Sequence, residues 1–183
     1  MPKILSKKFF DRPTVTVAKE LIGKYIVRQW RGQRIALRIT ETEAYDGPDD
    51  LASHASRGRT LRTQIMFGEA RRFYVYFVYG MHWLVNIVTG PRDYPAAILL
   101  RAGSYYDPKT KRESAINGPA RFAKFLNISK TQNGKRADKR TGLWFETRGM
   151  KIKPSQIMAQ KRIGVDYAGP VWANKPYRFK LNK

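Results

Sequence analysis

Two glutamates, Glu41 and Glu43, occupy positions of a predicted strand where apolar side chains would be expected. Residues 35, 37 and 39 are Ile, Leu and Ile, and alternate residues of a strand point to one face. The same parity continues to Glu41, Glu43 and Tyr45. A carboxylate on the core side must be hydrogen-bonded or paired, or its pKa rises, which is typical of a catalytic cleft. A β-bulge, or a strand that has emerged into solvent, would give the same spacing.

Arg101 ends a continuous apolar run, residues 95–100, that predicts a buried strand. Its guanidinium stays protonated, so at the end of a core strand it requires a carboxylate, and Glu41 or Glu43 would serve. The alternative is that Arg101 has already left the sheet.

His54 is one of two histidines in the chain and follows a turn-rich acidic loop. A neutral imidazole could present an N–H to a base edge, or His54 could bind a metal with the nearby acids. A surface histidine without a role has the same appearance. A metal-dependent nuclease is therefore an alternative function, because hard cations require convergent carboxylates. Its candidate ligands are Glu41, Glu43, Asp46, Asp49, Asp50 and His54.

Residues 73–89 predict a β-hairpin, because they form two runs of aromatic and β-branched residues around a turn near 79–81. The tip carries Tyr79, Met81, His82 and Trp83, where a solvent-facing turn usually carries small polar residues. In a basic protein such an apolar wedge can enter the base stack from the minor groove. A core hairpin whose turn packs under another element is the other interpretation.

The composition points to a polyanionic partner. The chain has 183 residues with 36 Lys and Arg against 14 Asp and Glu, a formal net charge of +22. This favours nucleic acid over a membrane surface, in one intracellular domain without an apolar signal or spanning segment. The absence of cysteine rules out disulfides and thiolate metal sites. A non-catalytic nucleic-acid-binding module would explain the charge and the aromatic residues, but not the carboxylates on the apolar parity.

The rest of the sequence predicts both helices and strands. It predicts a helix over 14–22 capped by Asp11 or Thr14, with Pro13 in its first turn and Gly23 as its stop, and a second helix over 117–126. Predicted strands lie at 25–30, 143–147, 151–153 and 177–181, with a polar connection at 105–114 and a basic loop at 129–142.

Together these stretches resemble the alkyladenine (3-methyladenine) DNA glycosylase family over nearly the whole chain. The motifs are Glu41-Thr-Glu43-Ala-Tyr45, Gly47-Pro48, His54, Met66-Phe67, Tyr74-Val-Tyr76, Tyr79-Gly-Met81, Asn86, Leu99-Leu-Arg101-Ala102, Asn117-Gly-Pro119, Arg162-Ile-Gly164, Tyr167-Ala-Gly169 and Lys175-Pro176-Tyr-Arg-Phe179. The resemblance implies one α+β domain over residues 1–183, with a curved antiparallel sheet, flanking helices and a protruding β-hairpin. It implies a monomeric, monofunctional enzyme that removes damaged purines from double-stranded DNA with no metal or other cofactor. We expect it to be intracellular and DNA-associated, in the cytoplasm or nucleoid of a bacterium or in the nucleus of a eukaryote.

The resemblance also implies roles for individual residues. Glu43 corresponds to the general base that activates water, and Arg101 and the backbone carbonyl of Ile163 correspond to groups that hold this water. The flipped-base pocket corresponds to Tyr45, His54 and Tyr76, with Asn86 helping to exclude unwanted bases. Tyr79 corresponds to the side chain that enters the minor groove. The chain departs from the family pattern in a loop at 55–64 that is one residue shorter, with Leu61 where proline is common, and in Glu69-Ala-Arg-Arg72.

The physical chemistry of the residues agrees with these roles. A base inside a duplex must be rotated out before its sugar can be attacked, and a wedge such as Tyr79 can fill the vacated stack. Departure of the base creates an oxocarbenium ion, which a buried carboxylate stabilises while it deprotonates water. We expect alkylated purines as substrates, with hypoxanthine and ethenoadenine as further candidates.

Overall fold

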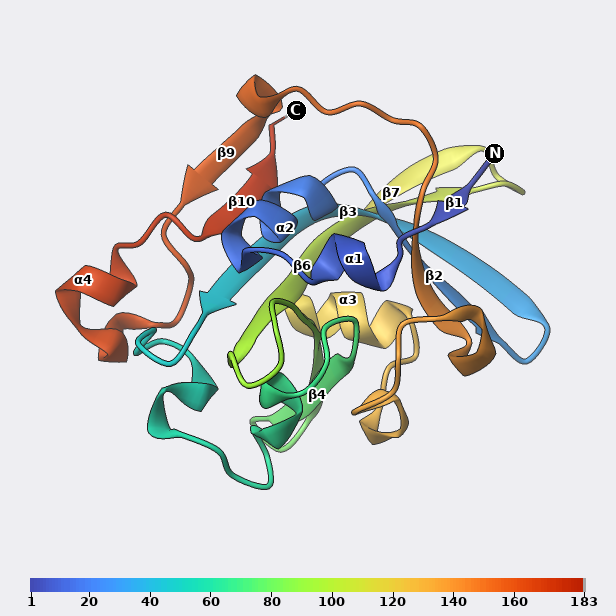
Figure 1. Ribbon diagram of the computed structural model, residues 1–183. Coiled ribbons are helices and arrows are strands. Elements are labelled where there is room, and N and C mark those ends of the chain that lie inside the picture. The colour runs from blue at the N-terminus through green and yellow to red at the C-terminus, as the bar shows by residue number, and fades with distance from the viewer. Residues whose placement is uncertain (183) are drawn as a thin grey trace.

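An antiparallel sheet of ten strands organises the computed structural model, which describes residues 1–182 (Figure 1). The main strand order is β1-β8-β2-β3-β6-β5-β4, with β7 paired to β6 and the β9–β10 pair attached to β3 through β10. The strands are β1 (Lys3–Ile4), β2 (Tyr25–Trp30), β3 (Gln33–Asp46), β4 (Phe73–Val78), β5 (His82–Val88), β6 (Ala96–Asp107), β7 (Arg112–Asn117), β8 (Leu143–Thr147), β9 (Ile157–Gln160) and β10 (Arg178–Leu181).

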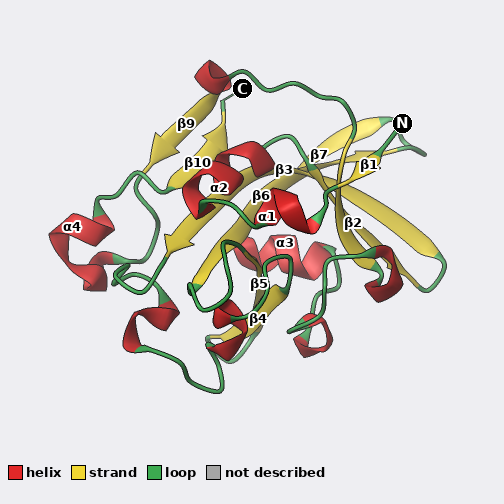
Figure 2. Ribbon diagram, in the orientation of Figure 1, coloured by secondary structure: helices red, strands yellow, loops and turns green. Residues whose placement is uncertain are grey.

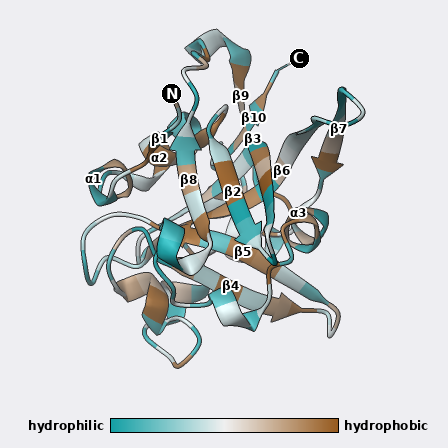
Figure 3. Ribbon diagram, turned by 90° about the vertical axis from the view of Figure 1, so that its right-hand side faces the viewer, coloured by the Kyte–Doolittle hydropathy of each residue, from teal (hydrophilic) through white to brown (hydrophobic). Residues whose placement is uncertain are grey.

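Four short α-helices accompany the sheet in the described part of the chain (Figure 2). They are α1 (Lys7–Phe10), α2 (Thr14–Leu21), α3 (Pro119–Phe125) and α4 (Gly169–Ala173). Helix α2 packs on β3 and β6, and α3 packs on β5, β6 and β7. Fully buried aromatic side chains fill the core between these layers, among them Phe10, Phe73, Phe122 and Phe145. The predicted α+β class is confirmed, and hydrophobic stretches alternate with hydrophilic ones along the central strands (Figure 3).

A local irregularity in the long β3–β6 pair determines which side chains face the core. The register shifts between Ile39 and Glu41 and again between Glu41 and Thr42, so that Thr40 on β3 and Arg101 on β6 are each passed over. Before the irregularity Ile39 faces the core, whereas after it Thr42 does, and the Thr42 hydroxyl donates to the carbonyl of Ala18 at 3.0 Å. Glu43 alternates with Thr42 and therefore faces away from α2. The β-bulge that was the alternative interpretation of this spacing is present, and Glu43, which follows it, is nevertheless buried.

The strand that starts at Ala96 extends to Asp107 and turns back through β7, so the polar connection predicted at 105–114 is wrong. β7 is an edge strand with mostly exposed side chains, so its backbone pairing leaves no hydrophobic alternation in the sequence. Residues 151–153 form no strand. The predicted capping of α2 by Asp11 or Thr14 is wrong, because Pro13 occupies the N-cap and Thr14 is already the first helical residue. Asp11 ends α1, and the Thr14 hydroxyl accepts from Thr89 inside the core.

The turn of the β4–β5 hairpin has a left-handed backbone at both central residues. Tyr79 has φ 53° and Gly80 has φ 65°, and the Met81 N–H donates to the Val78 carbonyl at 3.1 Å. This geometry suits the twist of a tight hairpin, but a bulky residue adopts it only at a cost in strain. Within residues 1–182, no helix is long and apolar enough to cross a membrane.

Candidate active site

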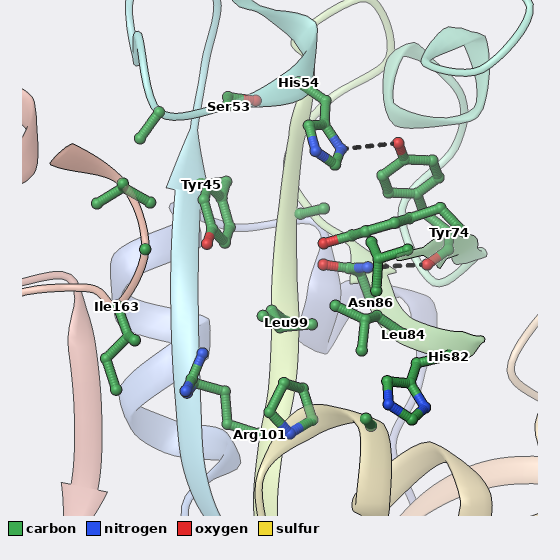
Figure 4. Close-up of a pocket in the computed structure, with 18 of the residues that line it drawn as sticks. Tyr45, Ser53, His54, Tyr74, His82, Leu84, Asn86, Leu99, Arg101 and Ile163 are labelled. Carbon is green, nitrogen blue, oxygen red and sulfur yellow. Dashed lines mark hydrogen bonds between the residues drawn. The ribbon is translucent and has the colours of Figure 1, made fainter. Parts of the chain in front are cut away.

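A cavity of about 430 Å³ opens where β3, β4, β5 and β6 meet the loop of His54 and the segment 163–167 (Figure 4). Seven of the eight side chains or residues predicted for the site line it: Tyr45, His54, Tyr76, Tyr79, Asn86, Arg101 and Ile163. The eighth, Glu43, is fully buried directly behind this wall and bonds to three of the lining residues.

Two hydrogen bonds and one ion pair hold the Glu43 carboxylate. The Tyr45 hydroxyl donates to Oε2 at 3.0 Å, and Arg101 Nη1 lies 3.2 Å from the same oxygen. The backbone N–H of Ile163 donates to Oε1 at 2.9 Å. Burial raises the pKa of Glu43 above its ordinary value, while Arg101, the Ile163 N–H and Tyr45 oppose this rise and Glu41 adds to it. Glu43 is thus a desolvated carboxylate whose ionised form is favoured by two hydrogen bonds and one positive charge, as a general base requires.

Arg101 is shared between two carboxylates. Its Nε donates to Glu41 Oε1 at 3.0 Å while its Nη1 faces Glu43, so both partners that the sequence allowed are used. Arg178 on β10 also donates to Glu41 Oε1, at 3.2 Å. Positive and negative side chains therefore alternate in one chain of contacts: Arg178 on β10, Glu41 on β3, Arg101 on β6 and Glu43 on β3.

His54 is held against the aromatic wall in its neutral form. Its Nδ1 lies 3.0 Å from the Tyr74 hydroxyl, and its ring meets the Tyr76 ring edge-on at 4.7 Å between centroids. Burial, and then the positive charge of Arg62, lower the pKa of His54 to about 4. A neutral imidazole whose Nδ1 accepts from Tyr74 carries its proton on Nε2, which is then free to donate to a ligand.

Asn86 has a fixed orientation. Its side-chain amide is buried on β5 and donates to the backbone carbonyl of Tyr74 at 3.0 Å (Figure 4). The amide lines the cavity beside Leu99, so a ligand that requires its space cannot rotate it away without breaking this bond.

Tyr79 stands at the cavity rim with 88 % of its surface exposed. It belongs to the strained hairpin turn, where a large apolar side chain gains nothing from water. Exposure and strain at one aromatic residue are typical of a functional position.

The sequence did not reveal a buried ion pair that organises the cavity. Asp50 and Arg162 are both fully buried and joined by bonds of 2.5 and 2.8 Å. Arg162 also donates to the carbonyls of Ala44 and Trp172, and Asp50 accepts the N–H of Ala52, so the pair ties β3 to the loop before His54 and to α4. The two residues are 112 positions apart, and no local pattern links them.

The acids of the nuclease alternative do not converge. Asp50 pairs with Arg162, and Glu41 pairs with Arg101 and Arg178. Across the described chain, no three His, Asp or Glu side chains are grouped so that they could hold a metal ion.

An α+β enzyme with an aromatic cavity over a buried carboxylate, in a chain of net charge +22, is of the class that excises bases from nucleic acid. Comparison with known families gives the same class: the model described as methylpurine-DNA glycosylase (MPG) matches residues 8–183. The chain belongs to this family and is a DNA glycosylase, a hydrolase with DNA as its substrate, which confirms the resemblance found in the sequence.

Similar proteins occur in archaea and bacteria. A protein of Methanocella arvoryzae is 43 % identical, over 96 % of this chain and 91 % of its own length. A protein of Anaeromyxobacter sp. strain Fw109-5 is also 43 % identical, over 97 % and 88 %. One of Streptomyces avermitilis is 41 % identical, over 97 % and 87 %. Each is named a 3-methyladenine DNA glycosylase, with the assignment given as provisional.

Proposed function

We propose that the chain removes alkylated purines, including 3-methyladenine, from duplex DNA by flipping the damaged nucleotide into the cavity and hydrolysing its N-glycosidic bond. Residues 1–183 act as one monomeric glycosylase domain that requires no cofactor. The observation that supports this most is the Glu43 carboxylate, fully buried behind the cavity wall and held by two hydrogen bonds and an ion pair with Arg101.

The cavity has the chemistry of a purine site. Tyr45 and Tyr76 supply aromatic faces, and the Nε2–H of neutral His54 donates to a ring nitrogen of the base. Asn86, fixed by its bond to Tyr74, excludes purines whose extra exocyclic group would require its space. Hypoxanthine and ethenoadenine are further substrates under this proposal, since both present a ring nitrogen acceptor.

Tyr79 stabilises the flipped state. An exposed aromatic wedge at the rim can enter the base stack and occupy the space that the target base leaves. Unpairing and unstacking cost a few kcal/mol, and the wedge offsets part of this cost before any bond is broken.

Glu43 then acts as general base. An ionised carboxylate offers about four lone-pair sites. Glu43 accepts hydrogen bonds from the Tyr45 hydroxyl and the Ile163 N–H and forms an ion pair with Arg101, which leaves a site for a water. As the C1′–N bond breaks, its electron pair leaves with the cationic methylpurine, which departs neutral. The water oxygen bonds to C1′ and its proton passes to Glu43, while Arg101 and the Ile163 carbonyl hold the water. We propose no amine nucleophile and therefore no strand cleavage.

The test is a Glu43→Gln variant, which removes the proton acceptor with little change in volume. In single-turnover assays on duplexes carrying 7-methylguanine, hypoxanthine or ethenoadenine, abasic sites should form with the wild type and not with the variant, while both bind DNA. Glu20→Gln is the matched control, because within residues 1–182 Glu20 pairs only with Arg12, on the surface. A Glu43→Gln variant that keeps a tenth of the wild-type rate would show that Glu43 is not the base. Direct strand breaks abolished by EDTA would favour the nuclease alternative.

A further inference from the structure

Glu41 lies beside the reacting carboxylate but does not line the cavity. Its side chain is 12 % exposed, and its Oε1 accepts from Arg101 Nε at 3.0 Å and from Arg178 Nη1 at 3.2 Å. One carboxylate oxygen thus binds two guanidinium groups. Glu43 alone would be enough to pair the charge of Arg101. The second carboxylate, Glu41, must therefore have a separate role.

The geometry shows what Glu41 does to Arg101. Because Glu41 takes the Nε edge, Arg101 presents only Nη1 to Glu43, at 3.2 Å, and cannot form the bidentate pair that most strengthens an arginine–carboxylate contact. Arg178 compensates Glu41 from the other side, and its Nε also donates to the Lys161 carbonyl at 2.8 Å, next to the segment that bears Ile163.

We propose that Glu41 is a positioning residue that divides the Arg101 guanidinium between two carboxylates and thereby keeps Glu43 a stronger base. This inference rests on the proposed role of Glu43. Without Glu41, Arg101 would turn to Glu43 alone and hold it as a weakly basic ion pair. A paired carboxylate is easy to ionise but a poor acceptor of the proton from water.

The surroundings of Glu43 fix the sign of the effect. The charged and titratable groups that act on it come from β3, β4, β6 and the 162–167 segment, and are Glu41, Tyr45, Tyr76, Arg101, Arg162 and Tyr167. Of these, Glu41 is the carboxylate, and its negative charge adds to the burial that raises the pKa of Glu43. Replacing Glu41 with a neutral side chain removes a like charge and frees an opposite one, and both changes lower that pKa.

The experiment compares Glu41→Gln with Arg178→Gln. Glu41→Gln keeps the size of the side chain and should move the acid limb of the single-turnover pH profile to lower pH, by about half a unit or more, with a lower plateau rate. Arg178→Gln leaves Glu41 to draw Arg101 towards itself, so the same limb should move to higher pH. General loosening of the site cannot move the two variants in opposite directions. The matched control is Glu113→Gln. Glu113 lies on β7 and pairs with Arg38 of β3, so its replacement should leave the acid limb of the pH profile unchanged.

A second measurement is independent of catalysis. Titration of the Glu43 side-chain carbon by NMR in the free protein, assigned with Glu43→Gln, should show the same opposite shifts in Glu41→Gln and Arg178→Gln. An unchanged or raised Glu43 pKa in Glu41→Gln, or shifts of both variants in one direction, would overturn the inference. A wild type that releases no base from any lesion would instead overturn the proposed function, while the titration would still decide the role of Glu41.

Discussion

Replacing Asp50 by Asn should strongly destabilise the protein, because it leaves Arg162 charged, buried and unpaired. The Asp50 carboxylate accepts four bonds: two from Arg162, at 2.5 and 2.8 Å, and the N–H groups of Asp46 and Ala52, at 3.0 and 3.1 Å. An Asn amide offers one oxygen and turns an NH₂ group towards donors. The Nε of Arg162 already has no hydrogen-bond partner among residues 1–182, so little remains to compensate the guanidinium.

Breaking a buried ion pair from one side costs about 3–5 kcal/mol. For a chain of this length, each 1 kcal/mol corresponds to about 2–4 °C in Tm, so we expect Tm to fall by about 6–20 °C. Thermal and urea-induced unfolding followed by circular dichroism measure this directly. The matched control is Asp93→Asn, which removes the exposed partner of Arg59 and should cost less than about 1 kcal/mol.

A double variant separates charge from packing. Asp50→Leu combined with Arg162→Met removes both charges, so it should recover part of the stability lost in Asp50→Asn. If Asp50→Asn loses no more stability than Asp93→Asn, an unpaired guanidinium at this position is not costly and the reasoning fails.

Three further predictions concern DNA and base recognition. Tyr79→Ser should slow base release from a stably paired lesion and affect a mismatched lesion much less, because unpairing there costs less; equal loss on both, with a lower Tm, would make Tyr79 structural. His54→Ala should reduce release of hypoxanthine more than that of a cationic methylpurine, whose bond is already labile. Since the pKa of His54 is about 4, this cost should stay constant between about pH 5 and 8, and a cost that varies across this range would contradict a neutral donor. The logarithm of DNA affinity should fall against the logarithm of salt concentration with a slope of about −0.9 for each phosphate contacted, and a flat response would contradict DNA as the partner of the basic surface.

The parts of the fold that the sequence predicts are those that local patterns specify. The strand Tyr25–Trp30 and the aromatic hairpin follow from β-branched and aromatic runs closed by turn residues. β7 could not be predicted, because its exposed side chains carry no alternation and it is held by backbone pairing with β6.

The same distinction holds for the candidate site. The carboxylates Glu41 and Glu43 and the apolar hairpin tip at Tyr79 are local signals. Tyr79 lines the cavity and Glu43 lies behind its wall, although the β-bulge, which local spacing did not settle, turns Glu43 away from the core face. The Asp50–Arg162 pair and the Ile163 N–H on Glu43 depend on contacts across more than 100 residues. No propensity or spacing encodes such contacts without the fold.

The paired irregularity at Thr40 and Arg101 changes which side chains of β3 face the hydrophobic core. Odd-numbered residues face it before the irregularity, and even-numbered residues face it afterwards. One extra residue on each strand cancels in the pairing, so Leu37 opposite Tyr105 and Glu43 opposite Leu99 belong to the same alignment of the two strands. If Thr40 and Arg101 were paired regularly instead of being skipped, the alternation from Ile39 would turn Glu43 and Tyr45 into the hydrophobic interior and bring Thr42 out. A graft of this candidate site onto another sheet must therefore include the irregularity as well as the side chains, because the same residues on a regular strand would point Glu43 towards the interior.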